Sequence, residues 1–364
     1  MWAYWLLFLV PAGIAFSPIR VDKNVNNILW IIFGVLGVLL IGLRYQVGGD
    51  WPAYLVYFEL ANSYDLGKAL MVGSGNASAY MLLNVIVAKM GLNIYAVNLF
   101  CGAIVMVGLI KYCLKQPLPW IALAVAIPYF VCCVGMGYTR QAVAAGFLFW
   151  GLSILRVGNE PKFFGLILLG SLFHLSLLVT MPLLMLVRKK FYWWYIPLFG
   201  LFIVGLYSLF NSLDLLRYYA LIYEYTVSRH SVGGEIRVYM TVLPVLLSLF
   251  FWQRIKRISP DDYEIIKWMA IISIVCIPAL SISTTLVDRF ALYLIPLQVA
   301  LWPRLIAVQR TTLNRSVWAS MTIFYYGLVL FVWFNFAVTR HEWVPYRMWP
   351  FTSEPIEQTL IPMF

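Results

Sequence analysis

The residues best suited to chemistry in this sequence are arginines that stand where apolar segments meet polar ones. Arg44 closes one such segment, Arg140 opens another and Arg289 opens a third. A guanidinium presents a planar fork of N–H donors that matches the oxygens of a carboxylate or phosphate. These arginines could therefore bind an anionic group near the boundary of an apolar layer. Alternatively, Arg140 could snorkel at its helix end, and Asp288 could simply neutralise Arg289.

Two further side chains could move a proton. Asp50 lies in "RYQVGGDWPAY", where its carboxylate could cap the helix predicted to begin at Trp51. His174 stands alone in the apolar stretch "LFHLSLL", where packing is the ordinary use of a histidine. Its titration range also suits a general base or a donor to a ligand, and the sequence leaves these alternatives open.

Glycines and aromatic residues around these positions could hold a sugar. Gly48 and Gly49 permit a tight turn and a close approach of the main chain to a ligand, although Arg44 could simply snorkel beside a belt of interfacial aromatics. The candidate ligand-binding residues are Tyr45, Gly48, Gly49, Tyr54, Gln141, Arg217, Arg229, Arg237, Tyr293, Tyr346 and Arg347. Their accumulation on one predicted face favours an anionic, sugar-bearing ligand.

The elements that must position these residues are membrane helices. Of the 364 residues, 63% are hydrophobic and 11% are charged, a balance that excludes a water-soluble domain. A spanning helix needs about 20 apolar residues, and apolar runs recur along nearly the whole chain. We predict an all-α, polytopic membrane protein of about 10–12 transmembrane helices, with residues 1–364 forming a single transmembrane domain.

Ten segments are predicted as full spans: 2–16, 25–43, 93–113, 119–135, 138–156, 191–210, 236–252, 264–281, 289–308 and 317–337. The first lacks a basic start and a cleavage site, so it is predicted to be retained. Segments 78–91 and 162–187 are ambiguous: the first could be re-entrant or interfacial, and the second could be a bent hairpin that returns to its own side. All basic clusters reach the cytoplasm only if neither segment crosses the membrane. Both termini, loops near 44–77 and 211–235, and the tail 338–364 would then lie outside.

The cysteines and histidines predict no metal site. The five cysteines stand in or at the ends of apolar segments without the spacing of a metal cluster, and the three histidines are far apart. We expect the cysteines to serve as small packing residues. No metal ion or other cofactor is predicted.

Several of these motifs together resemble a known family. The run Arg44–Tyr45, Val47–Gly48, Asp50 and Tyr54 resembles the signature RY-x-VG-x-D-x-x-x-Y of the EpsG family of polysaccharide-synthesis membrane proteins, within the broader Wzy-type polymerases. Gly49 stands where that pattern has threonine or another small polar residue. Further similar pieces follow in the same order: "AYMLLNVIV" (79–87), "TRQAVAAG" (139–146), "LFHLSLLV" (172–179), "DRFALYLIPL" (288–297) and "VPYR" (344–347).

The resemblance implies a GT-C-like glycosyltransferase of the bacterial inner membrane whose active site faces the periplasm. Its donor and acceptor would both be undecaprenyl-diphosphate-linked glycans, and it would use no metal or other cofactor. Membrane lipids and a chain-length-regulating co-polymerase are the implied partners, and nucleic acid is not one. The products would be O-antigen, capsule or exopolysaccharide.

Within that implied reaction, Arg44, Arg140 and Arg289 would stabilise the departing diphosphate. Either His174 or Asp50 would take the proton of the acceptor hydroxyl, and the sequence does not decide between them. The tail with Tyr346 and Arg347 would cover the bound glycan.

Other classes of protein fit parts of the pattern. An O-antigen ligase would use the same lipid-linked donor with a different acceptor. A flippase or transporter of lipid-linked sugars would show a polar pathway across the whole membrane and an internal repeat, neither of which the sequence displays. A membrane O-acyltransferase would need an acyl-donor site on the inner side, and no clear one is present.

Overall fold

The computed structural model describes residues 1–17, 22–68, 77–186, 200–201, 204–205, 208 and 233–352. Within these ranges the chain is helical and contains no β-strand, apart from an isolated antiparallel bridge between Arg44 and Met348. The predicted all-α class is therefore confirmed.

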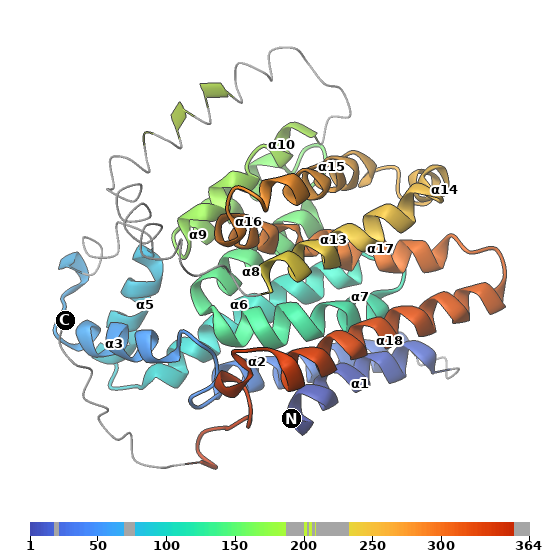
Figure 1. Cartoon of the computed structure of the whole chain (residues 1–364). Coiled ribbons are helices and arrows are strands. Elements are labelled where there is room, and N and C mark those ends of the chain that lie inside the picture. Colours follow the sequence, from blue (N-terminus) through green and yellow to red (C-terminus); the bar gives the residue numbers. More distant parts are fainter. Residues whose placement is uncertain are drawn as a thin grey trace.

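Most of the helices lie side by side in one bundle, with the shorter α3 and α5 beside one of its ends (Figure 1). The elements are α1 (Trp2–Phe16), α2 (Lys23–Gly42), α3 (Trp51–Asn62), α5 (Ser78–Lys89), α6 (Ile94–Leu114), α7 (Pro119–Ala126), η1 (Ile127–Gly135), α8 (Thr139–Ile154), α9 (Glu160–Ser171), η2 (Leu175–Thr180), α10 (Leu183–Leu186), α13 (Gly234–Leu249), α14 (Trp252–Ile258), α15 (Tyr263–Ala279), α16 (Thr284–Ala291), η3 (Leu292–Leu294), α17 (Ile295–Ala307), α18 (Thr312–Phe336) and η4 (Arg340–Glu342).

In the described ranges, four helical segments are long and apolar enough to cross a membrane: α2, α6, the continuous run from α16 to α17, and α18. A fifth arises if α13 and α14, bent by 92° at their junction, form one span. These segments confirm a polytopic membrane protein. The other predicted spans coincide with shorter helices or helix pairs, except 191–210, of which the structure describes only 200–201, 204–205 and 208. The count of ten or more therefore stays a prediction.

The two ambiguous segments are both short or broken. Residues 78–91 hold only the 12-residue α5, which packs against α3. Residues 162–187 form α9, a turn at Leu172–His174, and then η2 and α10, with α10 contacting α9 again. The second segment is thus a bent hairpin, and His174 lies at its tip.

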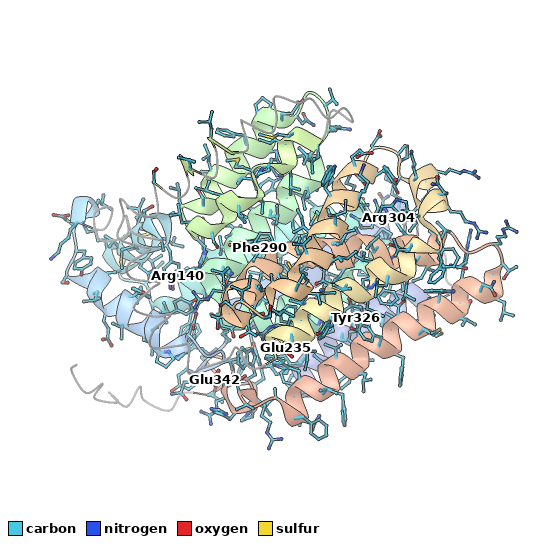
Figure 2. The ribbon with its side chains drawn as sticks, turned by 45° about the horizontal axis from the view of Figure 1, so that its top comes forward. Arg140, Glu235, Phe290, Arg304, Tyr326 and Glu342 are labelled. Carbon is cyan, nitrogen blue, oxygen red and sulfur yellow. The ribbon has the colours of Figure 1, made fainter. Side chains whose placement is uncertain are left out.

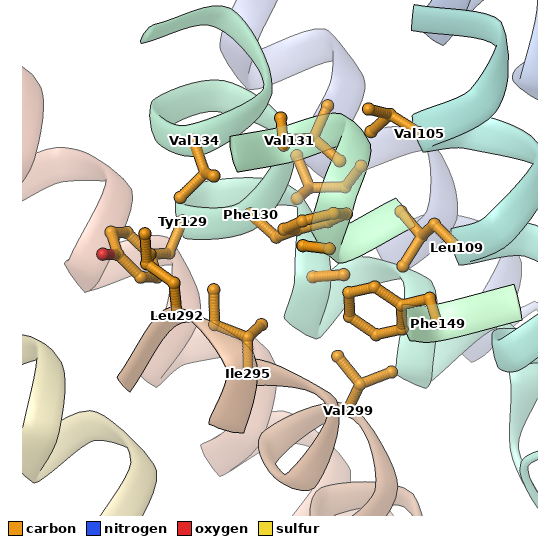
Figure 3. Close-up of a cluster of buried hydrophobic side chains, with 14 of the residues drawn as sticks. Val105, Leu109, Tyr129, Phe130, Val131, Val134, Phe149, Leu292, Ile295 and Val299 are labelled. Carbon is orange, nitrogen blue, oxygen red and sulfur yellow. The ribbon is translucent and has the colours of Figure 1, made fainter. Parts of the chain in front are cut away.

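α6 and α8 pack closely at the centre of the bundle, where side chains of η1 and α17 complete the hydrophobic cluster (Figure 3). The ring centroids of Phe130 and Phe149 lie 4.7 Å apart, between side chains of α6 and α17. A Cβ on Gly108 would lie 2.0 Å from the main-chain oxygen of Gly146, so α6 and α8 approach as closely as small residues allow. This crossing fixes the direction of α8, whose first turn carries Arg140.

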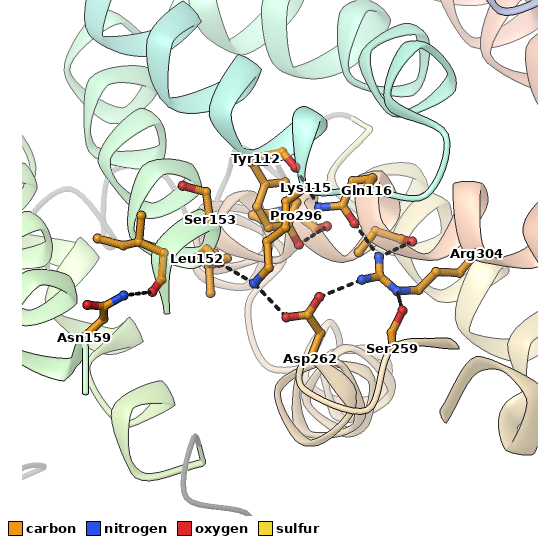
Figure 4. A network of polar contacts seen from close by, with 12 residues as sticks. Tyr112, Lys115, Gln116, Leu152, Ser153, Asn159, Ser259, Asp262, Pro296 and Arg304 are labelled. Carbon is orange, nitrogen blue, oxygen red and sulfur yellow. Dashed lines mark hydrogen bonds and ion pairs between the residues drawn. The ribbon is translucent and has the colours of Figure 1, made fainter. Parts of the chain in front are cut away.

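A buried polar network closes the end of the bundle remote from Arg140 (Figures 2 and 4). Arg304, 2% exposed, pairs with Asp262 at 2.8 Å, donates from Nε to Ser259 at 2.9 Å and bonds Gln116. Lys115 reaches the other oxygen of Asp262 at 2.7 Å. Every member of this network has a protein partner, so we assign it to joining α6, α15 and α17.

Candidate active site

The turn after α2 is built around Arg44, which is fully buried. Its Nη1 donates to the main-chain oxygen of Ile41 at 2.5 Å, its Nε to that of Val47 at 3.3 Å, and its Nη2 to Oγ1 of Thr139 at 2.7 Å. The guanidinium does not snorkel. Its donors go to the protein, so Arg44 holds the Gly48–Gly49 turn against the start of α8.

The glycine turn depends on its lack of side chains. Gly48 has φ +102°, and a Cβ there would lie 2.2 Å from the main-chain oxygen of Met136. Trp51 and Pro52 then start α3, as predicted. Asp50 occupies the N-cap position of α3, but its side chain makes no capping hydrogen bond. The carboxylate of Asp50 is therefore left for other contacts.

Asp50 lies beside Arg140 and a pair of tyrosines. The hydroxyl of Tyr54 donates to Oδ2 of Asp50 at 3.3 Å and also interacts with Arg140, whose guanidinium stands over the ring of Tyr57 at 5.1 Å. Burial raises the pKa of Asp50, and the charge of Arg140, the Tyr54 hydrogen bond and the charge of Arg289 offset that rise in part. A carboxylate with a raised pKa beside cationic groups is suited to accepting a proton.

Arg140 is half-buried, and none of the ion pairs formed by the described residues uses it. The next residue, Gln141, donates from Nε2 to the main-chain oxygen of Arg289 at 3.2 Å. This bond ties the start of α8 to α16 and keeps Arg289, which is solvent-exposed, near Arg140. The arrangement offers two guanidinium groups to one anion.

His174 joins the same cluster through a short hydrogen-bonded chain. Its Nδ1 lies 2.6 Å from Oγ of Ser176, which lies 2.8 Å from the hydroxyl of Tyr293. Burial lowers the pKa of His174, and the positive charges of Arg140 and Arg289 lower it further, so both arginines lie close enough to affect the imidazole. The structure thus brings together Asp50, Tyr54, Arg140, Gln141, His174, Arg289 and Tyr293 from four separate parts of the chain.

Arg237 has a different setting from the one we predicted. It is buried, and its Nε and Nη2 donate to the two carboxylate oxygens of Asp288, each at 2.5 Å. This bidentate ion pair joins α13 to α16. Asp288 therefore forms an ion pair with a residue of another helix, in addition to being the chain neighbour of Arg289. Arg217 and Arg229 lie outside the described residues.

The chain after α18 returns over the Arg44 turn. Tyr45 donates its main-chain N–H to the oxygen of Arg347 at 3.0 Å, and the hydroxyl of Tyr346 donates to the oxygen of Leu40 at 2.7 Å. Arg347 donates from its side chain to Gln46 at 2.8 Å. Tyr45, Tyr346 and Arg347 therefore attach the tail to the turn, and Glu342 of the tail reaches the glycines.

Sequence reasoning missed Ser176, Tyr57 and Glu342 as members of the site. Ser176 follows His174 by two residues, a spacing that could have suggested a shared hydrogen bond. Glu342 stands in the segment "TRHEWVPYRMWPF" (339–351), but nothing local to that segment places it against Gly49. Among the residues that the structure describes, no group of three or more histidine, cysteine, aspartate or glutamate side chains could hold a metal ion.

The fold and this cluster define a polytopic membrane protein with a cationic, partly acidic site at one end of a helical bundle. Residues 27–348 match the family model described as the EpsG family, so the chain belongs to that family of Wzy-type polysaccharide polymerase-like membrane proteins. Family membership indicates a polysaccharide polymerase-like role. No curated protein and no solved structure matches the chain significantly.

Proposed function

We propose that this protein is a glycosyltransferase that joins undecaprenyl-diphosphate-linked repeat units into O-antigen, capsule or exopolysaccharide. The observation that carries the proposal is the convergence of Arg140 and Arg289 with Asp50 and His174 at one end of the bundle. Two cations beside a carboxylate supply the two needs of the reaction: charge for a leaving diphosphate and a base for an attacking hydroxyl.

In the proposed step, the terminal hydroxyl of one lipid-linked unit attacks the anomeric carbon of the growing glycan. The bond between that carbon and the lipid diphosphate breaks, and the diphosphate leaves with both electrons of the bond. Arg140 and Arg289 stabilise its added negative charge. The hydroxyl proton passes to the carboxylate of Asp50, so the atoms and charges balance without a further reactant.

Asp50 is the base in this proposal because its carboxylate accepts only the Tyr54 hydrogen bond among the described contacts, and its pKa is raised by burial. His174 holds Ser176 through Nδ1 and would orient the glycan from its other ring nitrogen. Arg44 is not part of the diphosphate clamp, because its donors already have main-chain and Thr139 acceptors. Its contribution is to fix the Asp50 turn.

The test is to incubate purified protein in liposomes with lipid-linked repeat units alone, plus EDTA, and to resolve the glycans on a gel. A ladder of longer glycans is expected from the wild type. Arg140→Ala should abolish it, whereas Arg254→Ala, an arginine on α14 that stacks against Phe251, should not. Movement of the lipid-linked unit between leaflets without a ladder would instead favour a transporter, and transfer only to lipid A core would favour a ligase.

The location proposed for this reaction is the periplasmic face of the bacterial inner membrane. The two ends of the bundle differ in whether their charged side chains form ion pairs with the described part of the protein. At the Arg304 end each charged member of the network has a protein partner, whereas Arg140 takes part in none of the described ion pairs. A lipid diphosphate at the membrane surface is the ligand that such an arginine would serve.

A further inference from the structure

Glu342 places its carboxylate where a side chain of residue 49 would otherwise be. An ideal Cβ on Gly49 would lie 2.5 Å from Oε2 of Glu342, 3.3 Å from its Cδ and 3.6 Å from its Oε1. No real Cβ tolerates the first of these distances. The space beside Asp50 is thus filled by Glu342, which lies 293 positions after Gly49 in the chain.

The main chain that carries this carboxylate is anchored at the C-terminal end of η4. The main-chain oxygen of Glu342 accepts a hydrogen bond from the N–H of Gly48 at 2.8 Å. The next residue, Trp343, is 1% exposed and donates from Nε1 to the oxygen of Cys132 at 3.0 Å, while its own oxygen accepts from the hydroxyl of Tyr4 at 2.6 Å. Glu342 is therefore fixed in place, not carried on a freely moving tail.

This carboxylate makes no hydrogen bond or ion pair with the described residues, and its nearest opposite charge is the exposed His341 beside it in the chain. None of their hydrogen bonds or ion pairs involves Oε1 or Oε2 of Glu342, and the side chain is only half-buried. Burial raises the pKa of Glu342, the charge of the neighbouring His341 lowers it, and the charge of Asp50 raises it, which agrees with two carboxyl groups near each other. A partly buried acceptor with fixed geometry and no protein donor is arranged for donors that arrive with a ligand.

We propose that Glu342 accepts hydrogen bonds from hydroxyl groups of the acceptor sugar and so helps to select and position the unit that attacks. The inference rests on the proposed function. A carboxylate with two oxygens can bind two neighbouring hydroxyls of one ring, and a site built around such hydrogen bonds discriminates strongly against a sugar that lacks them. Glu342 is a ligand-binding residue in this scheme, and Asp50, one residue beyond Gly49, remains the base.

The acceptor site can be measured with the repeat unit carried on a lipid monophosphate, which can accept but lacks the diphosphate needed to donate. Its dissociation constant is measured by titration calorimetry in detergent, and its KM at saturating diphosphate-linked donor. Glu342→Ala should raise both about tenfold and change kcat less than about threefold, the pattern for loss of a binding contact. Glu342→Gln, which keeps one acceptor oxygen, should fall between Glu342→Ala and the wild type.

Gly49→Ala gives an independent test, because the added methyl group must displace the Glu342 carboxylate. We expect Gly49→Ala to weaken acceptor binding as Glu342→Ala does, and the double variant to be no weaker than either single one. The matched controls are Gly165→Ala, whose Cβ meets nothing within 4 Å, and Glu59→Ala, an exposed acid on α3. Both should bind the acceptor as the wild type does.

The outcomes separate this inference from the proposed function. Normal binding in Glu342→Ala, or additive losses in the double variant, would overturn the role of Glu342 even if the wild type polymerises. The wild type could bind the acceptor but show no transferase activity. If Glu342→Ala then weakens that binding, the role of Glu342 is supported and the proposed polymerase function is overturned. A wild type that does not bind the acceptor at all would overturn both.

Discussion

The side-chain amide of Gln141 lies 3.2 Å from the main-chain oxygen of Arg289 and donates a hydrogen bond to it. That single bond connects the first turn of α8 to α16. Of the two arginines in the proposed diphosphate clamp, Arg140 directly precedes Gln141 and Arg289 supplies the accepting oxygen. The spacing of the two guanidinium groups therefore depends on a residue that need not touch the substrate.

Replacing Gln141 by Ala should lower the rate of polymerisation about tenfold while leaving the melting temperature of the purified protein nearly unchanged. A displaced pair of donors stabilises the leaving diphosphate less well, because such stabilisation depends on preorganised geometry. The check is single-turnover transfer in liposomes beside a thermal melt in detergent. Gln309→Ala, which removes only a bond to the oxygen of Leu305 within α17 and the turn after it, is the control. An equal loss there would mean that glutamine removal acts through the fold.

Arg44→Ala should fail in a different way from Arg140→Ala. Removing the Arg44 guanidinium leaves the oxygens of Ile41 and Val47 and the hydroxyl of Thr139 without their donor in a fully buried place. Unsatisfied buried groups of this kind cost about 1–3 kcal/mol each, so the protein should melt several degrees lower or express poorly. Arg44→Lys should not restore stability, because an ammonium cannot reproduce three bonds in the guanidinium plane.

Arg347→Ala is the control for Arg44, since it removes one exposed hydrogen bond to Gln46 at the same turn. Its melting temperature should stay close to that of the wild type. If Arg44→Ala instead melted normally and lost all activity, the guanidinium would have to bind substrate directly and not through its bonds to Ile41, Val47 and Thr139.

The contrast between Arg44, which bonds to the protein, and Arg140, which forms none of the described ion pairs, shows how far the sequence could predict the site. The apolar runs predicted the positions of the helices, and the glycine–aspartate–tryptophan sequence predicted the start of α3 at Trp51. Both are local properties of the chain. Which arginine has protein acceptors is not local: the Thr139 that holds Arg44 is 95 residues away, and Glu342 reaches Gly49 only through the returning tail. Composition indicates a cationic face, and only packing shows which charges remain available for a ligand.

Polymerisation should lose rate at acidic pH if Asp50 is the base. Burial raises the pKa of its carboxyl above the ordinary value of 3.8, with Arg140, Tyr54 and Arg289 acting in the opposite direction. A base works only when ionised, so activity is present above this raised pKa and falls as the pH drops through it. The acid limb of the pH–rate profile should therefore lie at higher pH than a free aspartate would give.

Asp50→Asn should remove that acid limb and slow the remaining transfer by about 10²–10⁴, the usual contribution of a general base. Asp65→Asn, at an exposed acid beyond α3 whose carboxylate accepts from the N–H of Lys68, should keep both the limb and the rate. An acid limb that survives in Asp50→Asn would assign the proton transfer to another group, with His174 the first to examine.

Tyr293→Phe should lower activity about tenfold without removing the acid limb that Asp50 causes. The change deletes the hydroxyl that lies 2.8 Å from Oγ of Ser176 and leaves the buried ring in place. Ser176 can then turn away from Nδ1 of His174, and an imidazole that is less well oriented binds the glycan less precisely. Wild-type KM and kcat in Tyr293→Phe would show that His174 needs no such support.

Impermeant thiol labelling of whole cells or spheroplasts should place the Arg140 end of the bundle outside. His341 is exposed in the tail beside that end, and Val157 is exposed just after α8, whose last turn meets Lys115 in the network around Arg304. All five native cysteines are buried, so introduced thiols should label above a low background. We expect His341→Cys to react in intact spheroplasts and Val157→Cys only after permeabilisation. The reverse pattern would put Asp50 and Arg140 in the cytoplasm, where a lipid-linked glycan awaiting assembly outside could not reach them.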